Sequence, residues 1–159
     1  MTANIIIKRA TIDDSHEVAV MVGELLNEIM SAIAVRAFNF DLNETTARLK
    51  DFLHQEKYFV FVARNDDNRA VGFVALYESN ALYAEGSFGT IPELFVRPEY
   101  RSKSVGFQLL DRARSFGKSR GWSRLEVTTP PLPQFDKTLA FYEREGFAIT
   151  GGRKLGLAL

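Results

Sequence analysis

A short basic segment in front of a predicted helix has the residue types of an anion-binding site. The chain leaves a predicted strand at Val96, turns, and begins a helix near Ser104. A helix start has unpaired backbone N–H groups and a partial positive charge, so phosphate groups bind there readily. Arg101 and Lys103 add charge in front of it, and Gly106 leaves no side chain over its first turn. The segment predicts a phosphate site; the alternative is a solvated basic loop before an ordinary helix.

A single carboxylate marks a second place where chemistry is expected. Glu93 shares a predicted strand face with Ile91 and Phe95, which is unfavourable for a charge unless that face opens onto a pocket. We predict that Glu93 is a general base or positions a water molecule; the alternative is an ion pair with an arginine such as Arg124. Pro92 cannot donate a hydrogen bond to a sheet, so the strand is expected to lose pairing to one neighbour there.

Two motifs resemble the GNAT superfamily of acetyl-CoA-dependent N-acetyltransferases. The first is Val96-Arg-Pro-Glu-Tyr-Arg101-Ser-Lys-Ser104-Val-Gly106, which is similar to the family's strand end and its Gln/Arg-x-x-Gly-x-Gly/Ala loop. Ser102 and Ser104 stand where the family usually has glycine, and their side chains either crowd a pyrophosphate or donate hydrogen bonds to it. The second is Thr138-Leu-Ala-Phe-Tyr142-Glu-Arg-Glu-Gly-Phe147, which resembles the family's Ala-x-x-x-Tyr-x-x-x-Gly-Phe.

The resemblance implies roles for residues in and near these motifs. It implies acetyl-CoA as the cofactor, with backbone N–H groups near Phe95 and Val96 holding the pantetheine arm and polarising the thioester carbonyl. Tyr142 is expected to protonate the leaving thiolate, although its spacing alone predicts a tyrosine at the edge of the core. Asp136 is expected to make a polar contact to the pantetheine, because Phe135 stands where asparagine is common. The pyrophosphate is expected at Arg101, Ser102, Lys103, Ser104, Val105 and Gly106.

Length and composition narrow the classes of protein. The 159 residues fit one domain, 1–159, and twenty basic residues balance twenty acidic ones, so neither nucleic acid nor an anionic membrane is an expected partner. Without cysteine there is no disulfide, thiolate metal site or cysteine nucleophile. No metal site is expected either, because His16 and His54 lack partners at ligand spacing. No apolar window is long enough to span a membrane, and a cytoplasmic protein is expected.

Apolar periodicity predicts the elements that position these residues. Strands are predicted at 5–7, 58–63, 70–77, 87–96 and 122–129, and helices at 14–33, 43–53, 104–120 and 134–145. The strand, helix and strand after residue 87 predict a parallel βαβ unit, and residues 147–159 predict a closing hairpin. Asn43 is expected to cap the second helix. The loop before it, with Phe38 and Phe40, either walls a pocket or packs on the core.

These patterns, with the resemblance, predict an α/β protein with a GNAT-type mixed, partly splayed central sheet flanked by about four helices. The implied function is transfer of an acetyl group from acetyl-CoA directly to a primary amine in a ternary complex, since no cysteine is present to carry the acyl group. The expected partner is a small-molecule amine or an amino-terminal substrate, and the apolar last strand could pair two copies into a homodimer. The alternative function is a non-catalytic acyl-CoA-binding sensor or interaction module. Residues that line the acceptor site, or else are ordinary surface and strand residues, are Glu28, Arg36, Tyr83, Glu85, Thr128 and Thr129.

Overall fold

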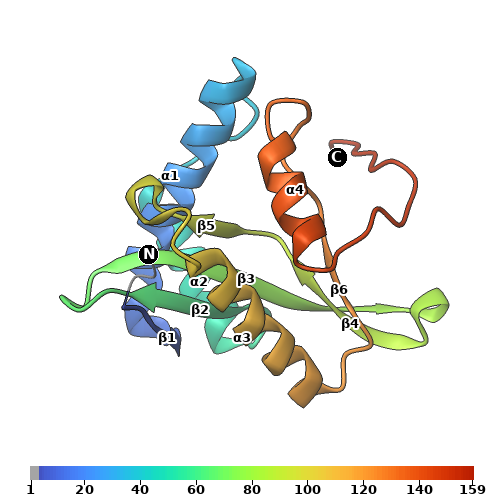
Figure 1. The fold of residues 1–159 in the computed structure, drawn as a ribbon, viewed down its shortest axis with the longest axis horizontal. Coiled ribbons are helices and arrows are strands. Elements are labelled where there is room, and N and C mark those ends of the chain that lie inside the picture. Colours follow the sequence, from blue (N-terminus) through green and yellow to red (C-terminus); the bar gives the residue numbers. More distant parts are fainter. Residues whose placement is uncertain (1–3) are drawn as a thin grey trace. The chain divides into compact units, whose positions relative to one another are not determined.

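The structure, a computed structural model, describes residues 4–159 as two units, Met1–Thr128 and Thr129–Leu159. The first unit is built on a mixed sheet of six strands (Figure 1). The strands are β1 (Ile6–Arg9), β2 (Phe59–Arg64), β3 (Ala70–Ala81), β4 (Gly86–Ile91), β5 (Leu94–Val96) and β6 (Leu125–Val127). Its helices are α1 (Ser15–Ile33), α2 (Leu42–His54) and α3 (Val105–Arg120), with short 3-10 turns at Ile12–Asp14, Leu82–Ala84 and Pro98–Tyr100.

The long strand β3 pairs with two different strands along the same edge. The strand order is β1-β2-β3-β4-β6, and only the β4–β6 pair is parallel. The carboxyl half of β3 pairs with β4, where Tyr77 lies opposite Thr90, and its amino half pairs with β5, where Phe73 lies opposite Phe95. Because β6 follows β4 and not β5, the sheet splays after Ile91. The predicted mixed, partly splayed sheet is confirmed.

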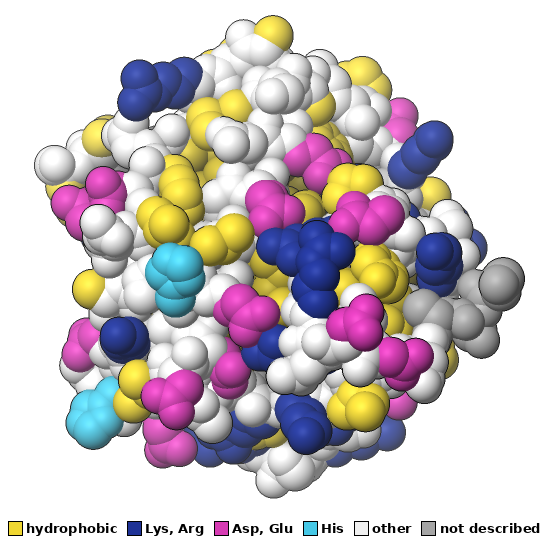
Figure 2. Space-filling model, turned by 90° about the vertical axis from the view of Figure 1, so that its left-hand side faces the viewer, with side chains coloured by type: hydrophobic (Ala, Val, Ile, Leu, Met, Phe, Trp, Pro, Cys, Tyr) yellow, Lys and Arg dark blue, Asp and Glu magenta, His cyan; other side chains and the backbone are white. Residues whose placement is uncertain are grey.

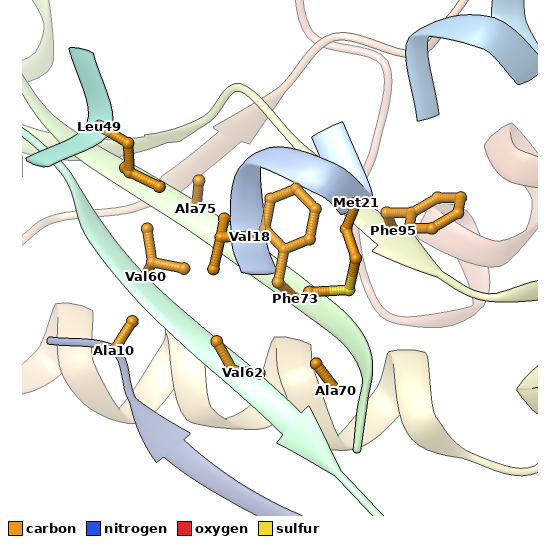
Figure 3. Close-up of a cluster of buried hydrophobic side chains, with 10 residues drawn as sticks. All are labelled: Ala10, Val18, Met21, Leu49, Val60, Val62, Ala70, Phe73, Ala75 and Phe95. Carbon is orange, nitrogen blue, oxygen red and sulfur yellow. The ribbon is translucent and has the colours of Figure 1, made fainter. Parts of the chain in front are cut away.

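Side chains that alternate along the strands build a core on each face of this sheet. Phe59 and Phe61 of β2 contact the ring of Phe116 on α3, at centroid distances of 4.8 and 5.5 Å. Val60 and Val62, which alternate with them along β2, point to the other face, where α1 and α2 pack. Figure 3 shows the buried cluster on that face, made by Ala10, Val18, Met21, Leu49, Val60, Val62, Ala70, Phe73, Ala75 and Phe95. Helices on both faces therefore fix the sheet and its splayed edge.

Proline explains where the structure departs from the predicted strand at 87–96. Pro92 has no N–H to donate, and the chain there forms two strands, β4 and β5, with Pro92 and Glu93 between them. The predicted parallel βαβ unit is confirmed as β4, α3 and β6. The last of these strands is shorter than predicted, because the Trp122 N–H donates to the Gly117 carbonyl at 2.9 Å and still belongs to the end of α3.

Helix α2 begins one residue earlier than predicted and has a different cap. The Asp41 carboxylate accepts a hydrogen bond from the Glu44 N–H at 2.8 Å. Its backbone is extended, as an N-cap requires, whereas Asn43 lies inside the helix. The prediction that Asn43 caps α2 is therefore wrong. In the loop before it, the Phe40 ring lies against Gly23 of α1, where an added Cβ would be 2.7 Å from the ring.

The second unit contains one helix, α4 (Asp136–Arg144). Tyr142 contacts the rings of Phe141 and Phe147, each at a centroid distance of 5.4 Å. Residues 147–159 form neither a helix nor a strand, so the predicted closing hairpin is wrong. The side chains of Leu155 and Leu157 are exposed, and a two-stranded hairpin without a buried face has little stability in water. That residues 1–159 form a single domain stays a prediction.

Candidate functional site

The splayed edge of β5 presents backbone N–H groups that no other strand of the described chain pairs with. The Ala75 N–H donates to the Glu93 carbonyl at 2.9 Å, and the Arg97 N–H donates to the Val71 carbonyl at 2.8 Å. These two bonds set the antiparallel register, in which hydrogen-bonding residues alternate along the strand. Leu94 and Val96 consequently turn their N–H groups away from β3, whereas the Phe95 N–H faces it. Leu94 was not predicted as a site residue; the alternation of an edge strand is the signal that identifies it.

Glu93 lies at the break between β4 and β5, beside this edge. Its carboxyl is half-buried and its Oε2 accepts a hydrogen bond from the Tyr58 hydroxyl at 3.5 Å. Burial raises the pKa of Glu93 to about 7, and the hydrogen bond from Tyr58 partly opposes that rise. A carboxylate with a pKa near neutral pH is well matched to accept a proton as a general base. Sequence reasoning missed Tyr58, which is 35 residues away and has no motif around it.

The alternative prediction, that Glu93 pairs with Arg124, is wrong. The Arg124 guanidinium pairs with Glu126 at 2.7 Å and lies over the rings of Tyr83 and Phe88. None of the ion pairs found in the described part of the chain includes Glu93. The Glu93 carboxyl therefore has a phenol as its partner rather than a cation.

The start of α3 is open in the way that an anion site requires. Its N-cap residue, Ser104, makes no side-chain hydrogen bond to the first turn of the helix. Ser102 and Ser104 have φ angles of 60° and 66°, a left-handed conformation that favours glycine. The backbone thus follows the path of a glycine-rich loop although both residues are serine. Their hydroxyls are exposed beside the helix start.

Arg97, just after β5, and Arg101, in this loop, each form an ion pair with a glutamate of α1. Arg101 forms two hydrogen bonds with Glu28, at 2.6 and 3.0 Å, and its Nε donates to the Val96 carbonyl at 2.8 Å. One turn away on α1, Glu24 accepts two hydrogen bonds from Arg97, at 2.8 and 3.1 Å. Bidentate arginine–carboxylate pairs fix orientation as well as charge. Arg101 and Glu28, predicted at separate sites, therefore contact each other.

Charges of both signs are mixed on the surface. Figure 2 shows basic side chains bordered by acidic ones on one face of the molecule. Lys103, whose Nζ lies 5.4 Å from the centre of the Tyr100 ring, keeps its charge close to the start of α3. With a formal net charge of zero, any attraction for an anion has to come from such local groups.

The residues of the first unit fit a ligand that has a pyrophosphate and an arm containing amides. The start of α3 offers unpaired N–H groups to a phosphate, and the N–H groups of Leu94 and Val96 are available to carbonyl oxygens of an extended arm. Among residues 4–159, no helix combines the length and the apolar character needed to cross a bilayer.

The remaining predicted site residues lie elsewhere in the two units. Tyr142 and Asp136 are on α4 in the second unit, where Tyr142 is buried and Asp136 is exposed. Tyr83 and Glu85 are exposed at the connection between β3 and β4. Arg36 is exposed in the loop before α2. The other four are Val105, which is buried at the first position of α3, Gly106 in the same turn, and Thr128 and Thr129 just beyond β6.

Comparisons with known proteins agree with this architecture. An "Uncharacterized N-acetyltransferase" of Archaeoglobus fulgidus is 37% identical over 73 residues, which are 45% of this chain and 48% of that protein. The aligned part spans about half the length of the curated relatives that the chain matches. An aminoglycoside acetyltransferase from an uncultured soil metagenomic sample, solved in complex with trehalose, superposes with a TM-score of 0.76 at 21% identity. That match covers 98% of this chain and 96% of the other.

A second solved structure has a similar fold. A predicted acetyltransferase of Clostridium acetobutylicum, solved with acetyl-CoA, superposes with a TM-score of 0.77 at 18% identity and covers 97% of this chain and 96% of its own. At such identities the two structures establish the fold alone. The model of the acetyltransferase (GNAT) family matches residues 24–147, from α1 to the end of the second motif. The chain therefore belongs to the GNAT acetyltransferase family.

Proposed function

We propose that this protein transfers an acetyl group from acetyl-CoA directly to a primary amine, with both substrates bound at once. The observation that carries the proposal is the position of Glu93, a carboxyl with a pKa of about 7, beside the open edge of β5. An amine reacts only in its neutral form, so the reaction needs a group that accepts its proton. Direct transfer is favoured because the chain has no cysteine to hold the acyl group.

The chain's own residues have separable roles in this proposal. Acetyl-CoA, when bound, supplies the acetyl group as a thioester. Glu93 takes the proton that the amine nitrogen loses as the C–N bond forms and the C–S bond breaks. The N–H groups of Leu94 and Val96 orient the pantetheine arm along β5, and the start of α3 holds the pyrophosphate. Tyr142 returns a proton to the departing thiolate, a role that rests on the family resemblance.

The acceptor proposed is a small molecule or peptide that carries a primary amine. One structural neighbour is an aminoglycoside acetyltransferase solved in complex with sisomicin. Other candidates in the same chemical class are polyamines, amino acids and protein amino termini. The protein is proposed to act in the cytoplasm, and pairing of two copies through the tail is kept as a further proposal.

A non-catalytic acyl-CoA-binding module is the second candidate. Ser102 and Ser104 place side chains at backbone positions that favour glycine, and Arg101 is held by Glu28. These contacts would suit a protein that senses the cofactor through the position of α1. The two candidates differ in one measurable property, which is the release of free thiol.

The test is a panel of primary amines incubated with acetyl-CoA, with thiol release as the readout. We expect one class of amine to release thiol. We also expect Glu93→Gln to lower kcat/KM for that amine by about 100-fold. Binding of acetyl-CoA, followed by calorimetry, should be retained in that variant. Glu44→Gln is a matched control, because this carboxylate is exposed in the first turn of α2 and has no part in the proposed site, and it should leave the rate unchanged.

Three results separate the candidates. Thiol release that depends on Glu93 supports the enzyme. Binding of acetyl-CoA without thiol release from any amine favours the sensor. The absence of both heat and a melting shift with acetyl-CoA contradicts both proposals.

A further inference from the structure

We infer that Tyr58 is a positioning residue for Glu93, fixing its carboxylate so that one oxygen is held by the protein and the other is left for the amine. This inference rests on the proposed role of Glu93 as the proton acceptor. Tyr58 precedes β2, and Glu93 lies between β4 and β5, so the two residues meet only in the folded chain.

Tyr58 is the donor and Glu93 the acceptor in this hydrogen bond. The Tyr58 hydroxyl lies 3.5 Å from Oε2 of Glu93. An ionised carboxylate only accepts hydrogen bonds, so the phenol is the donor. Oε1 has no hydrogen bond from the protein in the described chain, and it is the oxygen that remains for a proton from the substrate.

Two neighbouring rings hold the phenol in place. The Tyr58 ring lies 5.1 Å from that of Phe52 on α2 and 6.1 Å from that of Tyr77 on β3. Tyr77 stacks nearly parallel to it, with an interplanar angle of 13°. A ring packed on two sides loses little further freedom when its hydroxyl forms a hydrogen bond. Tyr58 is thus already ordered for the contact with Glu93.

The electrostatics agree with this geometry. Burial, with the nearby Glu93 carboxylate, raises the pKa of Tyr58, so the phenol keeps its proton throughout the range in which Glu93 titrates. The hydrogen bond from Tyr58 lowers the pKa of Glu93, against the larger effect of burial. The titratable groups packed here are Tyr58, just before β2, and Tyr77 on β3, and α2 contributes the ring of Phe52. In the described chain no lysine, arginine or histidine pairs with Glu93.

The experiment is a carbon-13 NMR titration of the Glu93 carboxyl in the ligand-free protein, with its signal assigned from Glu93→Gln. Tyr58→Phe removes the hydroxyl and keeps the ring, so the midpoint of the Glu93 titration should rise by about half to one pH unit. Tyr77→Phe is the matched control; it removes the hydroxyl of the adjacent ring and should leave that midpoint in place. An unchanged midpoint in folded Tyr58→Phe overturns the inference.

A second measurement needs no change at Tyr58. In the native protein the Cζ signal of Tyr58 should shift with the same midpoint as the Glu93 carboxyl, and that shift should vanish in Glu93→Gln. A Tyr58 signal that ignores the Glu93 titration overturns the inference even if Tyr58→Phe does not fold. Neither readout uses acetyl-CoA or an amine. If the carboxyl responds to Tyr58 but no amine releases thiol, the positioning contact stands and the proposed enzymatic function fails.

Discussion

At the residue scale, the Glu93 carboxyl binds its proton more tightly in the folded protein than in the unfolded chain. Its pKa is about 7 in the fold, against an ordinary value of 4.5. Between these two values the folded state holds a proton that the unfolded state has lost, so the free energy of unfolding falls as pH rises through this window. Above pH 7 the carboxylate is ionised in the fold, at a cost to stability of up to about 3 kcal/mol.

Glu93→Gln should therefore be more stable than the native protein at pH 8 and close to it at pH 4.5. The amide has the same shape without the charge, so it removes the cost of an ionised, half-buried group. Thermal melting across pH 4.5 to 8 measures the difference. A variant that is less stable at pH 8 would show that the carboxylate is well solvated, which contradicts a raised pKa.

Tyr142→Phe tests the residue that only the family resemblance assigns. If the phenol protonates the leaving thiolate, the variant should lose about 100-fold in kcat while its dissociation constant for acetyl-CoA stays the same. Phe141→Leu, at the neighbouring position on α4, is a control for packing changes near the ring. Equal losses in both variants would assign Tyr142 a structural role.

The pattern of residue types marked Glu93 as a candidate site residue but did not predict its hydrogen-bond partner. A carboxylate on the same predicted strand face as Ile91 and Phe95 was enough to mark it as unusual. Which group it meets depends on the pairing of β2, β3 and β5, which brings Tyr58 close across 35 positions of the chain. The hydrogen bond is therefore a property of the tertiary fold.

At the scale of elements, the β4–β6 pair depends on a close approach at Gly89. A Cβ on Gly89 would lie 2.4 Å from the Trp122 ring and 2.7 Å from Leu125. That ring is held by a hydrogen bond from its Nε1 to Glu78 at 2.7 Å, so it has little room to move. The parallel pairing of β4 with β6 beside the splay therefore requires a residue without a side chain at position 89.

Gly89→Ala should lower the melting temperature by about 2–12 °C, because overpacking a rigid site costs about 1–3 kcal/mol. Gly156→Ala is the control, since a Cβ there meets nothing within 4 Å. Calorimetric melting of both variants measures the difference. A melting temperature for Gly89→Ala equal to that of the control would show that Trp122 repacks freely.

The sequence predicted most elements and misplaced several of their ends. The break at Pro92 was predicted as a loss of pairing, and the structure resolves it into two strands that share β3. The backbone of the loop at Ser102 and Ser104 could not be predicted from serine itself, because residues with a Cβ rarely adopt the left-handed conformation that both have. The family motif predicted the position of that loop, not its conformation.

At the scale of the whole molecule, the carboxyl-terminal tail contributes little to the stability of one chain. Leu155, Leu157 and Leu159 are 90%, 86% and 117% exposed, and the sequence had suggested a strand for this segment. Deleting residues 153–159 should therefore leave the melting temperature within about 2 °C of the native value. Melting and size-exclusion chromatography at two concentrations measure both stability and assembly. A marked loss that grows with dilution would support the predicted homodimer instead.

The long strand β3 orders the splayed edge of the sheet before any ligand binds. The twelve residues of β3 pair with β4 along one half and with β5 along the other. A single strand therefore fixes both strands that border the splay. An extended ligand that binds along β5 as an additional strand would meet an edge that is already ordered. The conformational entropy of that edge was lost when the protein folded, so binding does not have to order it again. The slowest amides to exchange with heavy water should accordingly lie in the middle of β3, with the protein free of any ligand.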